Sequence, residues 1–357
     1  MEIITEKDEW NRVLTRFSNF NDVYFHYEYF KLFANHYNAK PEGLVWEDQH
    51  VCIFWSHLIR GIPNTLNDTH NYFDLITPYG YGGPLIHYKN DDISKRTKSL
   101  QLFMRDYYHF AKENNYISEF IRFHPVLKNW ETFSEGFENH ISLHYNNDTV
   151  LIDLRNDLDK IWQGIRKGHK YNIKKTKREN CEVKISENPL ESDIDEFISL
   201  YYDTMKNNCA SDKYFFAPSF IKDHFSSLFS VLVEVNCSEQ LMGASMFIAG
   251  NSIVNYHLSG SKKNIKGVYP SETIIWNAIK WAKNNDFTYL HLGGGFGESD
   301  SLFNFKKGFS NTITPYYTGR IIFDDAKYRE FSQFCTFNNA ENTFFPAYRY
   351  GQSHTII

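Results

Sequence analysis

The chain contains the same arrangement of residues twice, and this repeat limits the folds that it can adopt. Both copies have apolar residues at helical spacing, then the sequence Ala-Lys-x-Asn, then a short run rich in β-forming residues. The shared sequence is Ala111–Asn114 in the first copy and Ala282–Asn285 in the second. Each copy therefore predicts a helix that ends in a polar stop and is followed by a buried strand.

The residues upstream of each copy follow the same plan. Residues 43–59 and residues 230–250 each predict two strands joined by a tight polar turn, and a third strand is predicted after each pair. A further strand, residues 149–154, opens the second half. Each half is thus expected to run helix, antiparallel strands, helix, strand, which is an α+β arrangement.

The composition is that of a globular protein with well-filled cores. The 357 residues are 42% apolar and 23% charged, with a net charge of -5, so the chain as a whole is a poor binder of nucleic acids. No apolar run approaches the roughly 20 residues of a membrane helix, and no secretion signal is visible. We therefore expect a cytoplasmic protein. The cysteines are odd in number and scattered, which predicts free thiols: Cys52, Cys181, Cys209, Cys237 and Cys335.

One stretch between the halves is strongly basic. A predicted helix, capped by Asn156 or Asp157, carries apolar residues on one face and then becomes rich in cations. Two interpretations stay open: a solvated charged face, or a local patch for an anionic partner such as tRNA. The residues are Arg166, Lys167, His169, Lys170, Lys174, Lys175, Lys177 and Arg178.

Six motifs, in order along nearly the whole chain, resemble the FemABX-type (FemAB-like) transferases. They are TPYGYGGP from Thr77, FIRFHP from Phe120, IRKGHKYNIKKTKRE from Ile165, DTMKNNCASDKYFF from Asp203, AIKWAKNN from Ala278 and HLGGGFGESDSLFNFKKGF from His291. The resemblance implies an α+β (mixed α/β) fold of two tandem GNAT-like domains, whose mixed, centrally splayed sheets are flanked by helices. It implies a first domain of residues 1–147 with a return segment from about 321 to 357, and a second domain of residues 148–320.

The resemblance also implies cytoplasmic enzymes that acylate an amine. FemX-like members move an amino acid from aminoacyl-tRNA onto a peptidoglycan precursor. The chain lacks the long heptad insertion of the larger Fem proteins, so it resembles the compact, FemX-sized type. No cofactor is implied beyond the acyl donor, which is aminoacyl-tRNA or an acyl-CoA.

Lys306 is the first candidate for a catalytic residue, together with Phe305. In FemX-like enzymes the matching Phe-Lys pair is expected to face the donor ester, with the lysine at the tRNA end or at the developing oxyanion. A fixed cation beside an oxyanion lowers the barrier by several kcal/mol, of the order of 2.7–4 kcal/mol for a single donor. The neighbouring Lys307 is a donor-binding candidate, and two surface lysines at a turn are the alternative interpretation.

A second donor-binding candidate is the segment before the helix that carries the second repeat copy. CoA-dependent GNAT proteins hold pyrophosphate there with a small-residue loop at a helix N-terminus. Gly267 is present, with Lys263 and Lys266 beside it, but Tyr269 occupies the last small position. This degraded loop favours tRNA over acetyl-CoA as the donor.

The acceptor-binding candidates come from both halves. Tyr79 and Tyr81 lie in PYGYGGP, where three of seven residues are glycine and tight turns are possible, either to hold a sugar or diphosphate or as a structural corner. The remaining candidates, placed by region or by the resemblance, are Lys31, Arg60, Thr204, Asn208 and Tyr214.

A general base is not identified by any motif. Asp74, Asp300, His257 and His291 are candidates by region only. The sequence has no H-E-x-x-H, Walker or G-x-S-x-G motif, so a metal site, NTP hydrolysis and serine-esterase chemistry have no support.

Three functions are therefore considered. The first is transfer of an aminoacyl group to an amine of a nucleotide- or lipid-linked envelope glycan precursor, with peripheral membrane contact where the acceptor is a lipid. The second is a CoA-dependent N-acyltransferase that acts on an amino sugar. The third is a non-catalytic module that binds the glycan precursor.

Overall fold

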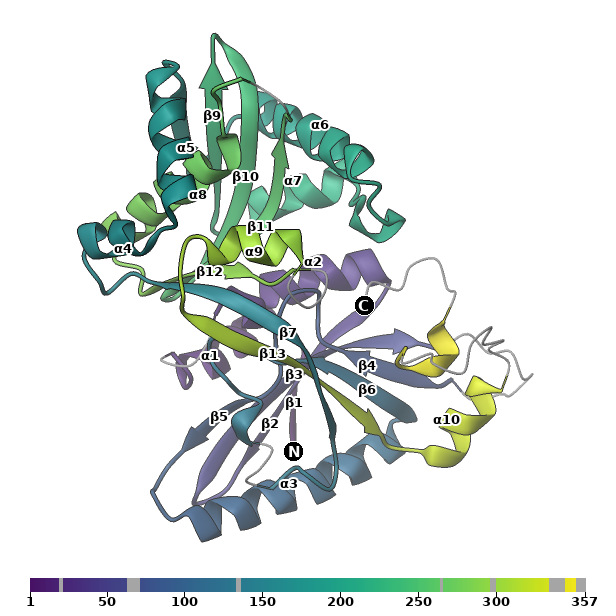
Figure 1. The fold of residues 1–357 in the computed structure, drawn as a ribbon. Helices are drawn as coiled ribbons and strands as arrows, with labels where there is room; N and C mark the ends of the chain where they lie inside the picture. Colours follow the sequence, from purple (N-terminus) through teal and green to yellow (C-terminus); the bar gives the residue numbers. More distant parts are fainter. Residues whose placement is uncertain are drawn as a thin grey trace. The chain divides into compact units, whose positions relative to one another are not determined.

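The computed structural model describes residues 1–18, 22–62, 71–132, 136–263, 266–295, 300–333 and 344–350, apart from the side chain of Lys213. The chain divides into two compact units. Unit 1 comprises Met1–Asn146 and Tyr316–Ile357, and unit 2 comprises Asn147–Pro315 (Figure 1). The divisions at 146/147 and 315/316 lie one and five residues before the predicted boundaries. Within the described residues, no helix is long and apolar enough to span a bilayer.

Unit 1 is a mixed sheet with helices on both faces. The strand order is β1-β2-β3-β4-β6-β13, with β5 paired to β3, and β4 runs parallel to β6. The strands are β1 (Glu2–Ile4), β2 (Lys40–Glu47), β3 (Val51–Gly61), β4 (Phe73–Ile76), β5 (Leu85–Tyr88), β6 (Tyr116–Arg122) and the end of β13 (Ile313–Ile322). The helices are α1 (Lys7–Thr15), η1 (Val23–Phe25), α2 (Tyr27–Tyr37), α3 (Ile93–Glu113), α10 (Asp325–Ser332) and η4 (Ala347–Arg349).

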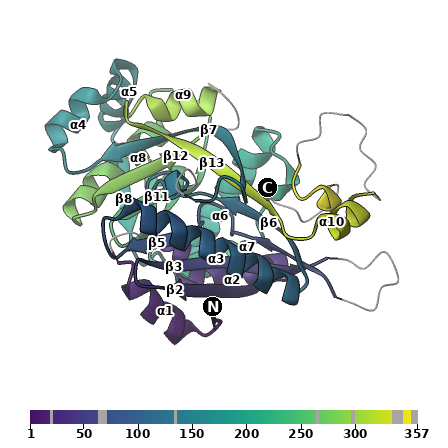
Figure 2. The same ribbon diagram turned by 90° about the horizontal axis from the view of Figure 1, so that it is seen from below.

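Strand β3 shows why unit 1 has two layers of helices. Its residues from Val51 to Leu58 are all buried, which is the pattern of a central strand covered on both faces. Ile53 and Trp55 belong to the apolar cluster formed with α3. Phe54 points to the opposite face, where its ring contacts Trp10 of α1. Alternate side chains therefore join different layers, with α3 on one face and α1 and α2 on the other (Figure 2).

Unit 2 has the same kind of sheet. Its order is β7-β12-β11-β10-β9-β8, and the pair β11–β12 is parallel. The strands are the second part of β7 (Ser142–Asp153), β8 (Glu182–Ser186), β9 (Ser230–Cys237), β10 (Gln240–Gly250), β11 (Ile253–Ser261) and β12 (Tyr289–Gly293). The helices are α4 (Leu158–Gly164), α5 (Lys167–Arg178), α6 (Glu191–Asn207), η3 (Asp212–Tyr214), α7 (Pro218–Ser227), α8 (Pro270–Asn284) and α9 (Ser301–Lys307). In Figure 1, α5 and α8 lie on one side of β9 and β10, and α6 and α7 on the other.

The repeated Ala-Lys-x-Asn sequence is a helix C-cap in both units. Asn114 ends α3 and Asn285 ends α8, and each amide donates to the carbonyl oxygen four residues earlier, at 2.9 Å. The next residues, Asn115 and Asp286, have φ angles of 56° and 59°. A left-handed residue after the cap turns the chain sharply into the following strand. The repeat seen in the sequence therefore codes for the same helix-to-strand corner twice.

The sheet of unit 2 opens between its parallel strands. Strands β11 and β12 pair only from Ile253–Tyr289 to Asn255–His291, while β11 continues to Ser261. A bulge in the pairing with β10 lies at the same level, since Met246 pairs with Leu258 but Phe247 pairs with Tyr256. Bulges bend a strand and increase its twist. Strand β11 therefore separates from β12 beyond Asn255.

The prediction that all cysteines are free is wrong for two of them. Cys181 and Cys237 form a disulfide, while Cys52 and Cys209 are free thiols and Cys335 lies outside the described residues. Strands β8 and β9 are antiparallel, and Glu182 pairs with Asn236. The two cysteines are thus the next pair across the strands. Because 56 residues separate them in sequence, only the strand register brings them together.

Candidate functional site

Helix α9 positions Lys306. The helix begins after Asp300, whose carboxylate accepts a hydrogen bond from the backbone N–H of Phe303 at 2.7 Å. A carboxylate N-cap of this kind stabilises the first turn of a helix. Phe303 and Lys306 are three residues apart and share the buried face of α9. The cap therefore fixes the direction in which Lys306 enters unit 2.

The Lys306 ammonium lies at the opening between β11 and β12. The side chain is 7% exposed, and its Nζ donates to the carbonyl oxygen of Gly294 at 2.6 Å. It also lies 5.7 Å from the ring centroid of Tyr256. Gly294 directly follows β12, and Tyr256 is the first residue of β11 beyond the parallel pairing. The lysine thus contacts both strands just beyond the level at which they stop pairing.

Burial changes the acidity of this lysine. Desolvation lowers the pKa of Lys306 to about 8, and the nearby charge of Asp300 opposes the decrease. Among the described residues, no carboxylate forms an ion pair with it. A buried cation with this pKa is charged below pH 8 and releases its proton easily above it. Such a group can stabilise an oxyanion or take part in proton transfer.

The glycines before α9 provide clearance. A Cβ on Gly294 would lie 2.8 Å from the carbonyl oxygen of Asp148, and a Cβ on Gly295 would lie 2.2 Å from Oδ1 of Asp300. Gly293 has a φ of 71°, a conformation that favours glycine. The backbone therefore passes close to Asp148 and Asp300 at these two glycines. Gly297 lies outside the described residues.

Phe305 and Lys307 point elsewhere. The Phe305 ring packs against His169 at 5.1 Å and Phe309 at 5.6 Å, and it joins the apolar cluster of unit 2. Its position is that of a packing residue, without contact to the Lys306 amine. Lys307 is exposed and lines a pocket together with Arg166. One helix thus directs two successive lysines to different surroundings.

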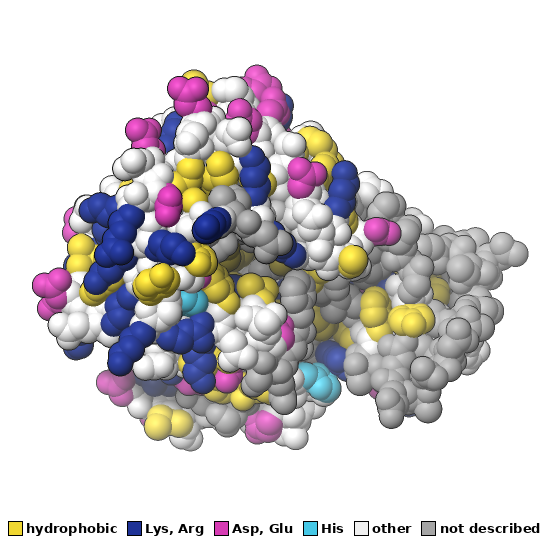
Figure 3. Space-filling model, turned by 45° about the horizontal axis from the view of Figure 1, so that its top comes forward, with side chains coloured by type: hydrophobic (Ala, Val, Ile, Leu, Met, Phe, Trp, Pro, Cys, Tyr) yellow, Lys and Arg dark blue, Asp and Glu magenta, His cyan; other side chains and the backbone are white. Residues whose placement is uncertain are grey.

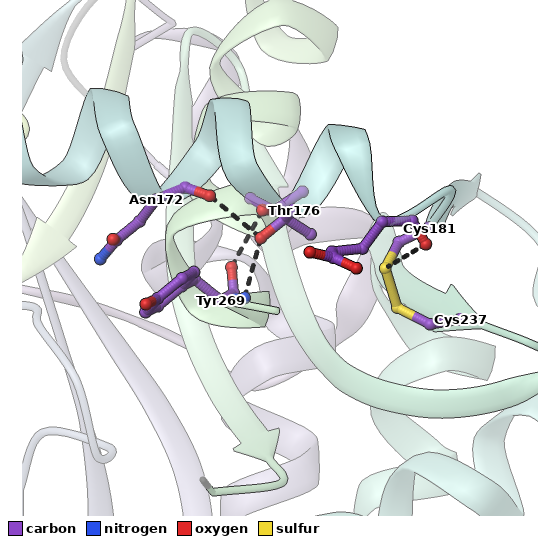
Figure 4. The surroundings of a disulfide bond; sticks show 7 residues. Asn172, Thr176, Cys181, Cys237 and Tyr269 are labelled. Carbon is purple, nitrogen blue, oxygen red and sulfur yellow. Dashed lines mark hydrogen bonds between the residues drawn. A yellow bond between two sulfur atoms is a disulfide. The ribbon is translucent and has the colours of Figure 1, made fainter. Parts of the chain in front are cut away.

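The loop predicted to bind the donor is already covered by α5. Gly267 has a φ of 86°, and a Cβ there would lie 2.5 Å from Oε1 of Glu179. The backbone N–H of Tyr269, at the start of α8, donates to Oγ1 of the buried Thr176 at 2.8 Å (Figure 4). Asn172 donates to Glu272 in the first turn of α8 at 2.8 Å. Side chains of α5 and two carboxylates thus occupy the place where a phosphate would meet this helix N-terminus.

The remaining donor candidates do not converge on Lys306. Lys263 is exposed and donates to Oδ1 of Asn208 at 2.5 Å, so a donor candidate and an acceptor candidate pair with each other. Lys266 is exposed. Thr204 accepts from the N–H of Ser261 at 2.9 Å and donates to Leu200 at 2.8 Å. Its hydroxyl therefore ties α6 to β11.

Tyr214 lies in η3, and its carbonyl oxygen accepts a hydrogen bond from the hydroxyl of Tyr201 at 2.6 Å. Desolvation raises the pKa of Tyr214. The structure gives this segment a packing role beside α6.

Arg60 is buried in an ion-pair cluster of unit 1, so it does not line a groove. Its Nε donates to Oδ1 of Asp74 at 2.8 Å, and Arg349 from η4 donates to the other oxygen of Asp74. Arg349 also donates to the carbonyl oxygen of Gly61 at 2.8 Å. Desolvation lowers the pKa of Arg60. This cluster fastens the return segment onto β3 and β4, and it removes Asp74 from the candidates for a general base.

The other acceptor candidates of unit 1 have varied surroundings. Lys31 is exposed on α2. The carbonyl oxygen of Tyr79 accepts from the hydroxyl of Tyr29 at 2.7 Å. The Tyr81 ring lies edge-on to Tyr24 at 5.2 Å and to Tyr316 at 5.3 Å. The PYGYGGP segment is therefore an aromatic corner, and its part in acceptor binding stays a prediction.

The histidine candidates for a general base lie within the fold. The His257 ring packs on His224 with centroids 5.0 Å apart, and desolvation lowers the pKa of His257 well below its usual value. His291 is 1% exposed within β12. Asp300 is the N-cap of α9. In the described part of the chain, no group of three or more His, Cys, Asp or Glu residues is arranged to hold a metal ion.

Three residues at these sites were not anticipated from the sequence. Tyr256 faces the Lys306 ammonium, and Glu179 covers Gly267. Arg122 is 3% exposed at the end of β6, and its Nη1 donates to the carbonyl oxygen of Thr77 at 2.7 Å. The sequence does contain a signal for Arg122, because an arginine within an otherwise apolar strand, as in FIRFHP, indicates a buried charge with a specific role. Tyr256 and Glu179 depend on contacts between distant segments.

Comparison with known proteins identifies the fold. No curated protein matches the chain in sequence. The crystal structure of FemX superposes with a TM-score of 0.69 at 11% identity, covering 92% of this chain and 99% of that chain. The structure of L-PGS from Bacillus licheniformis has a TM-score of 0.55 at 10% identity, covering 88% and 91%. A putative lysylphosphatidylglycerol synthetase domain from Agrobacterium fabrum has a TM-score of 0.52 at 11% identity, covering 90% and 94%.

These matches confirm the predicted fold class, a mixed α/β fold, and the chain divides into two units as predicted. The model of the FemAB family matches residues 227–324, which run from the end of α7 to β13 and include Lys306. The resemblance to the FemAB-type family is thereby confirmed over this segment.

Proposed function

We propose that this protein is an acyltransferase that forms amide bonds. Its donor is an aminoacyl-tRNA, and its acceptor is an amine of a nucleotide- or lipid-linked precursor of a cell-envelope glycan. The observation that carries the proposal is the buried Lys306 ammonium at the opening between β11 and β12. Three similarities support aminoacyl transfer as the class of reaction. They are the FemAB match over residues 227–324, the fold of FemX, and the fold of a domain described as a putative lysylphosphatidylglycerol synthetase.

The proposed reaction needs a cation at one step, the formation of the oxyanion. The acceptor nitrogen attacks the ester carbonyl carbon, a C–N bond forms, and the carbonyl oxygen becomes an oxyanion. The ester C–O bond then breaks, and the ribose hydroxyl leaves with a proton while the nitrogen loses one. Lys306 in its protonated form faces the oxyanion, where low dielectric strengthens the interaction. The ester is already activated, so these steps need no cofactor.

The surroundings of α8 favour tRNA over acyl-CoA as the donor. In a CoA-dependent transferase, the N-terminus of this helix binds pyrophosphate. Here Thr176 accepts from the N–H of Tyr269, and the carboxylates of Glu179 and Glu272 lie at the same end. A phosphate placed there would lose a donor and meet two like charges. Charged tRNA is present in the cytoplasm, and a cytoplasmic location belongs to the same proposal.

The test is transfer by the purified protein. Charged tRNA and amino-sugar nucleotides are supplied as substrates, and amide products are measured by mass spectrometry. Lys306→Met should abolish the product, whereas Lys98→Met, which changes an exposed lysine of α3, should not. Product formed from acetyl-CoA but not from charged tRNA would favour the CoA-dependent alternative. Glycan binding that persists without transfer from any donor would favour the binding module.

A further inference from the structure

A pocket of about 360 Å³ lies on unit 2 beside α9, and the chemistry above does not use it. The corner between α4 and α5 forms one wall, and the end of α9 with the turn after it forms the other. The backbone N–H of Arg166 donates to the carbonyl oxygen of Gly308 at 2.8 Å, so the two walls are bonded together. The lining residues are Gly164, Arg166, Asn304, Lys307, Gly308 and Asn311.

The lining has the chemistry of an anion site. Arg166 and Lys307 supply two cations, and no carboxylate is among the lining residues or pairs with either cation in the described structure. Arg166 Nη2 makes only longer contacts, 3.2 Å to Nε2 of His169 and 3.3 Å to the carbonyl oxygen of Asn304. Most donors of its guanidinium thus face the pocket or solvent. An anion with several acceptor oxygens suits this arrangement.

Gly308 allows the guanidinium to reach this position. A Cβ on Gly308 would lie 2.9 Å from Nη2 of Arg166 and 2.2 Å from Nε2 of His169. Any other residue would therefore displace the arginine and the histidine beneath it. His169 in turn contacts the carbonyl oxygen of Phe305 at 2.9 Å. The arginine is thus built against the backbone of the same helix that carries Lys306.

Helix α5 extends the positive surface away from the pocket. Lys and Arg side chains gather on this side of unit 2, with apolar side chains between them (Figure 3). Tyr171 is 59% exposed, and the Lys175 ammonium lies 5.9 Å from its ring centroid. Lysines beside an exposed aromatic ring suit a strand of phosphates and bases. Of the described residues, none forms an ion pair with the other cations of this face: Lys167, Lys170, Lys174, Lys177 and Arg178.

We propose that the pocket binds a backbone phosphate of an RNA strand and that the outward face of α5 holds the adjoining nucleotides. The inference rests on the proposed function for the identity of the RNA, which is the donor tRNA. Successive residues of α9 then have separate tasks. Lys306 faces the ester from inside unit 2, and Lys307 holds the phosphate in the pocket. The ligand class itself follows from the two unpaired cations and the charge of α5.

The experiment measures RNA binding without any transfer. Fluorescence anisotropy measures the binding of a labelled RNA hairpin that ends in single-stranded CCA and carries no amino acid, over a range of salt concentrations. The double variant Arg166→Gln/Lys307→Gln should bind about tenfold more weakly, and the slope of log K against log salt should fall by about 0.7 to 0.9 for the one phosphate that is no longer neutralised. Lys98→Gln/Lys112→Gln makes the same change of charge at exposed lysines of α3 and should keep the slope. The double variant Arg166→Lys/Lys307→Arg keeps both positive charges and should therefore keep the wild-type slope.

The outcomes separate the pocket from the chemistry. Equal affinity and slope in the two double variants would overturn the pocket assignment, whatever the transfer assay gives. RNA binding that depends on the pocket, without transfer from any donor, would remove the proposed function and leave the pocket in place. Vesicles of phosphatidylglycerol form the other arm. If they bind through Arg166 and Lys307 while RNA does not, the ligand is a lipid headgroup and the RNA proposal is wrong.

Discussion

The ammonium of Lys306 and the carbonyl oxygen of Gly294 lie 2.6 Å apart, although they come from different elements. One group lies on a helix, and the other lies just beyond the last residue of β12. Their bond lies at the point where β11 and β12 separate. The backbone at Gly294 is therefore anchored by the side chain to which we assign the chemistry.

Lys306→Met should make unit 2 more stable while it removes transfer. Desolvation lowers the pKa of Lys306 from its usual value to about 8, so keeping the charge buried at pH 7 costs about 3 kcal/mol. Loss of the donor to Gly294 costs about 1 kcal/mol, which leaves a net gain of about 2 kcal/mol. Urea unfolding at pH 7 measures this gain in the free energy of unfolding.

The stability of the wild-type protein should also depend on pH. Because the unfolded chain binds the Lys306 proton more tightly, wild-type stability should rise between pH 8 and 10.5, and the variant should lack that rise. If Lys306→Met were less stable than wild type, the interactions of the buried ammonium would outweigh its desolvation cost, and the prediction would be wrong.

The rate of transfer should fall as pH rises through about 8. Our assignment needs the protonated form of Lys306, and the pKa of about 8 sets the position of the descending limb. Lys306→Arg keeps a cation whose own pKa is far higher, so any activity that it retains should continue beyond pH 9. The measurement is kcat against pH for both proteins. A wild-type rate that instead increases through pH 8 would assign the neutral amine as a general base.

Acetyl-CoA and inorganic pyrophosphate should not stabilise the wild-type protein. Thr176 and the carboxylates of Glu179 and Glu272 occupy the N-terminus of α8. Glu179→Gln/Glu272→Gln removes both negative charges and should gain a measurable increase in Tm with pyrophosphate, whereas Glu113→Gln, on α3, should not. A shift of several degrees for the wild-type protein with acetyl-CoA would return the CoA-dependent alternative to first place.

Asp74→Asn should destabilise unit 1 by about 3–5 kcal/mol. The carboxylate lies between the guanidinium groups of Arg60 and Arg349, and all three residues are at most 8% exposed. Removing one charge leaves the others buried without compensation. Chemical denaturation measures the change. Asp91→Asn breaks an ion pair with Arg96 at an exposed carboxylate and should have little effect. A loss equal to that of Asp91→Asn would mean that η4 does not hold the return segment to the sheet.

The fold was predictable because its signals are local. Helical spacing and the caps at Asn114 and Asn285 depend on a few neighbouring residues, and they occur twice. The choice of Lys306 came from a short motif. Its burial and its lowered pKa depend on Tyr256 and Gly294, which only the tertiary structure brings close.

The predictions that failed depend on distant segments. Arg60 was an acceptor-binding candidate because the sequence does not show that it is buried against Asp74, whose other carboxylate oxygen accepts from Arg349, 275 positions beyond Asp74. The disulfide was missed because the register of β8 and β9 cannot be derived from cysteine spacing. The cover over Gly267 was missed for the same reason, since Glu179 lies at the end of α5, 88 positions earlier in the sequence.

The attachment of α5 at both ends has a consequence for affinity. Twelve residues with many like charges would form a weak helix in isolation, because such charges repel at helical spacing. Here the Arg166–Gly308 backbone bond holds the beginning, and the Thr176–Tyr269 bond holds the end, about three turns of helix away. Cys181, three residues beyond the helix, is linked to β9. The entropic cost of ordering this surface is therefore already met when the domain folds. Binding of an RNA strand does not incur that cost a second time.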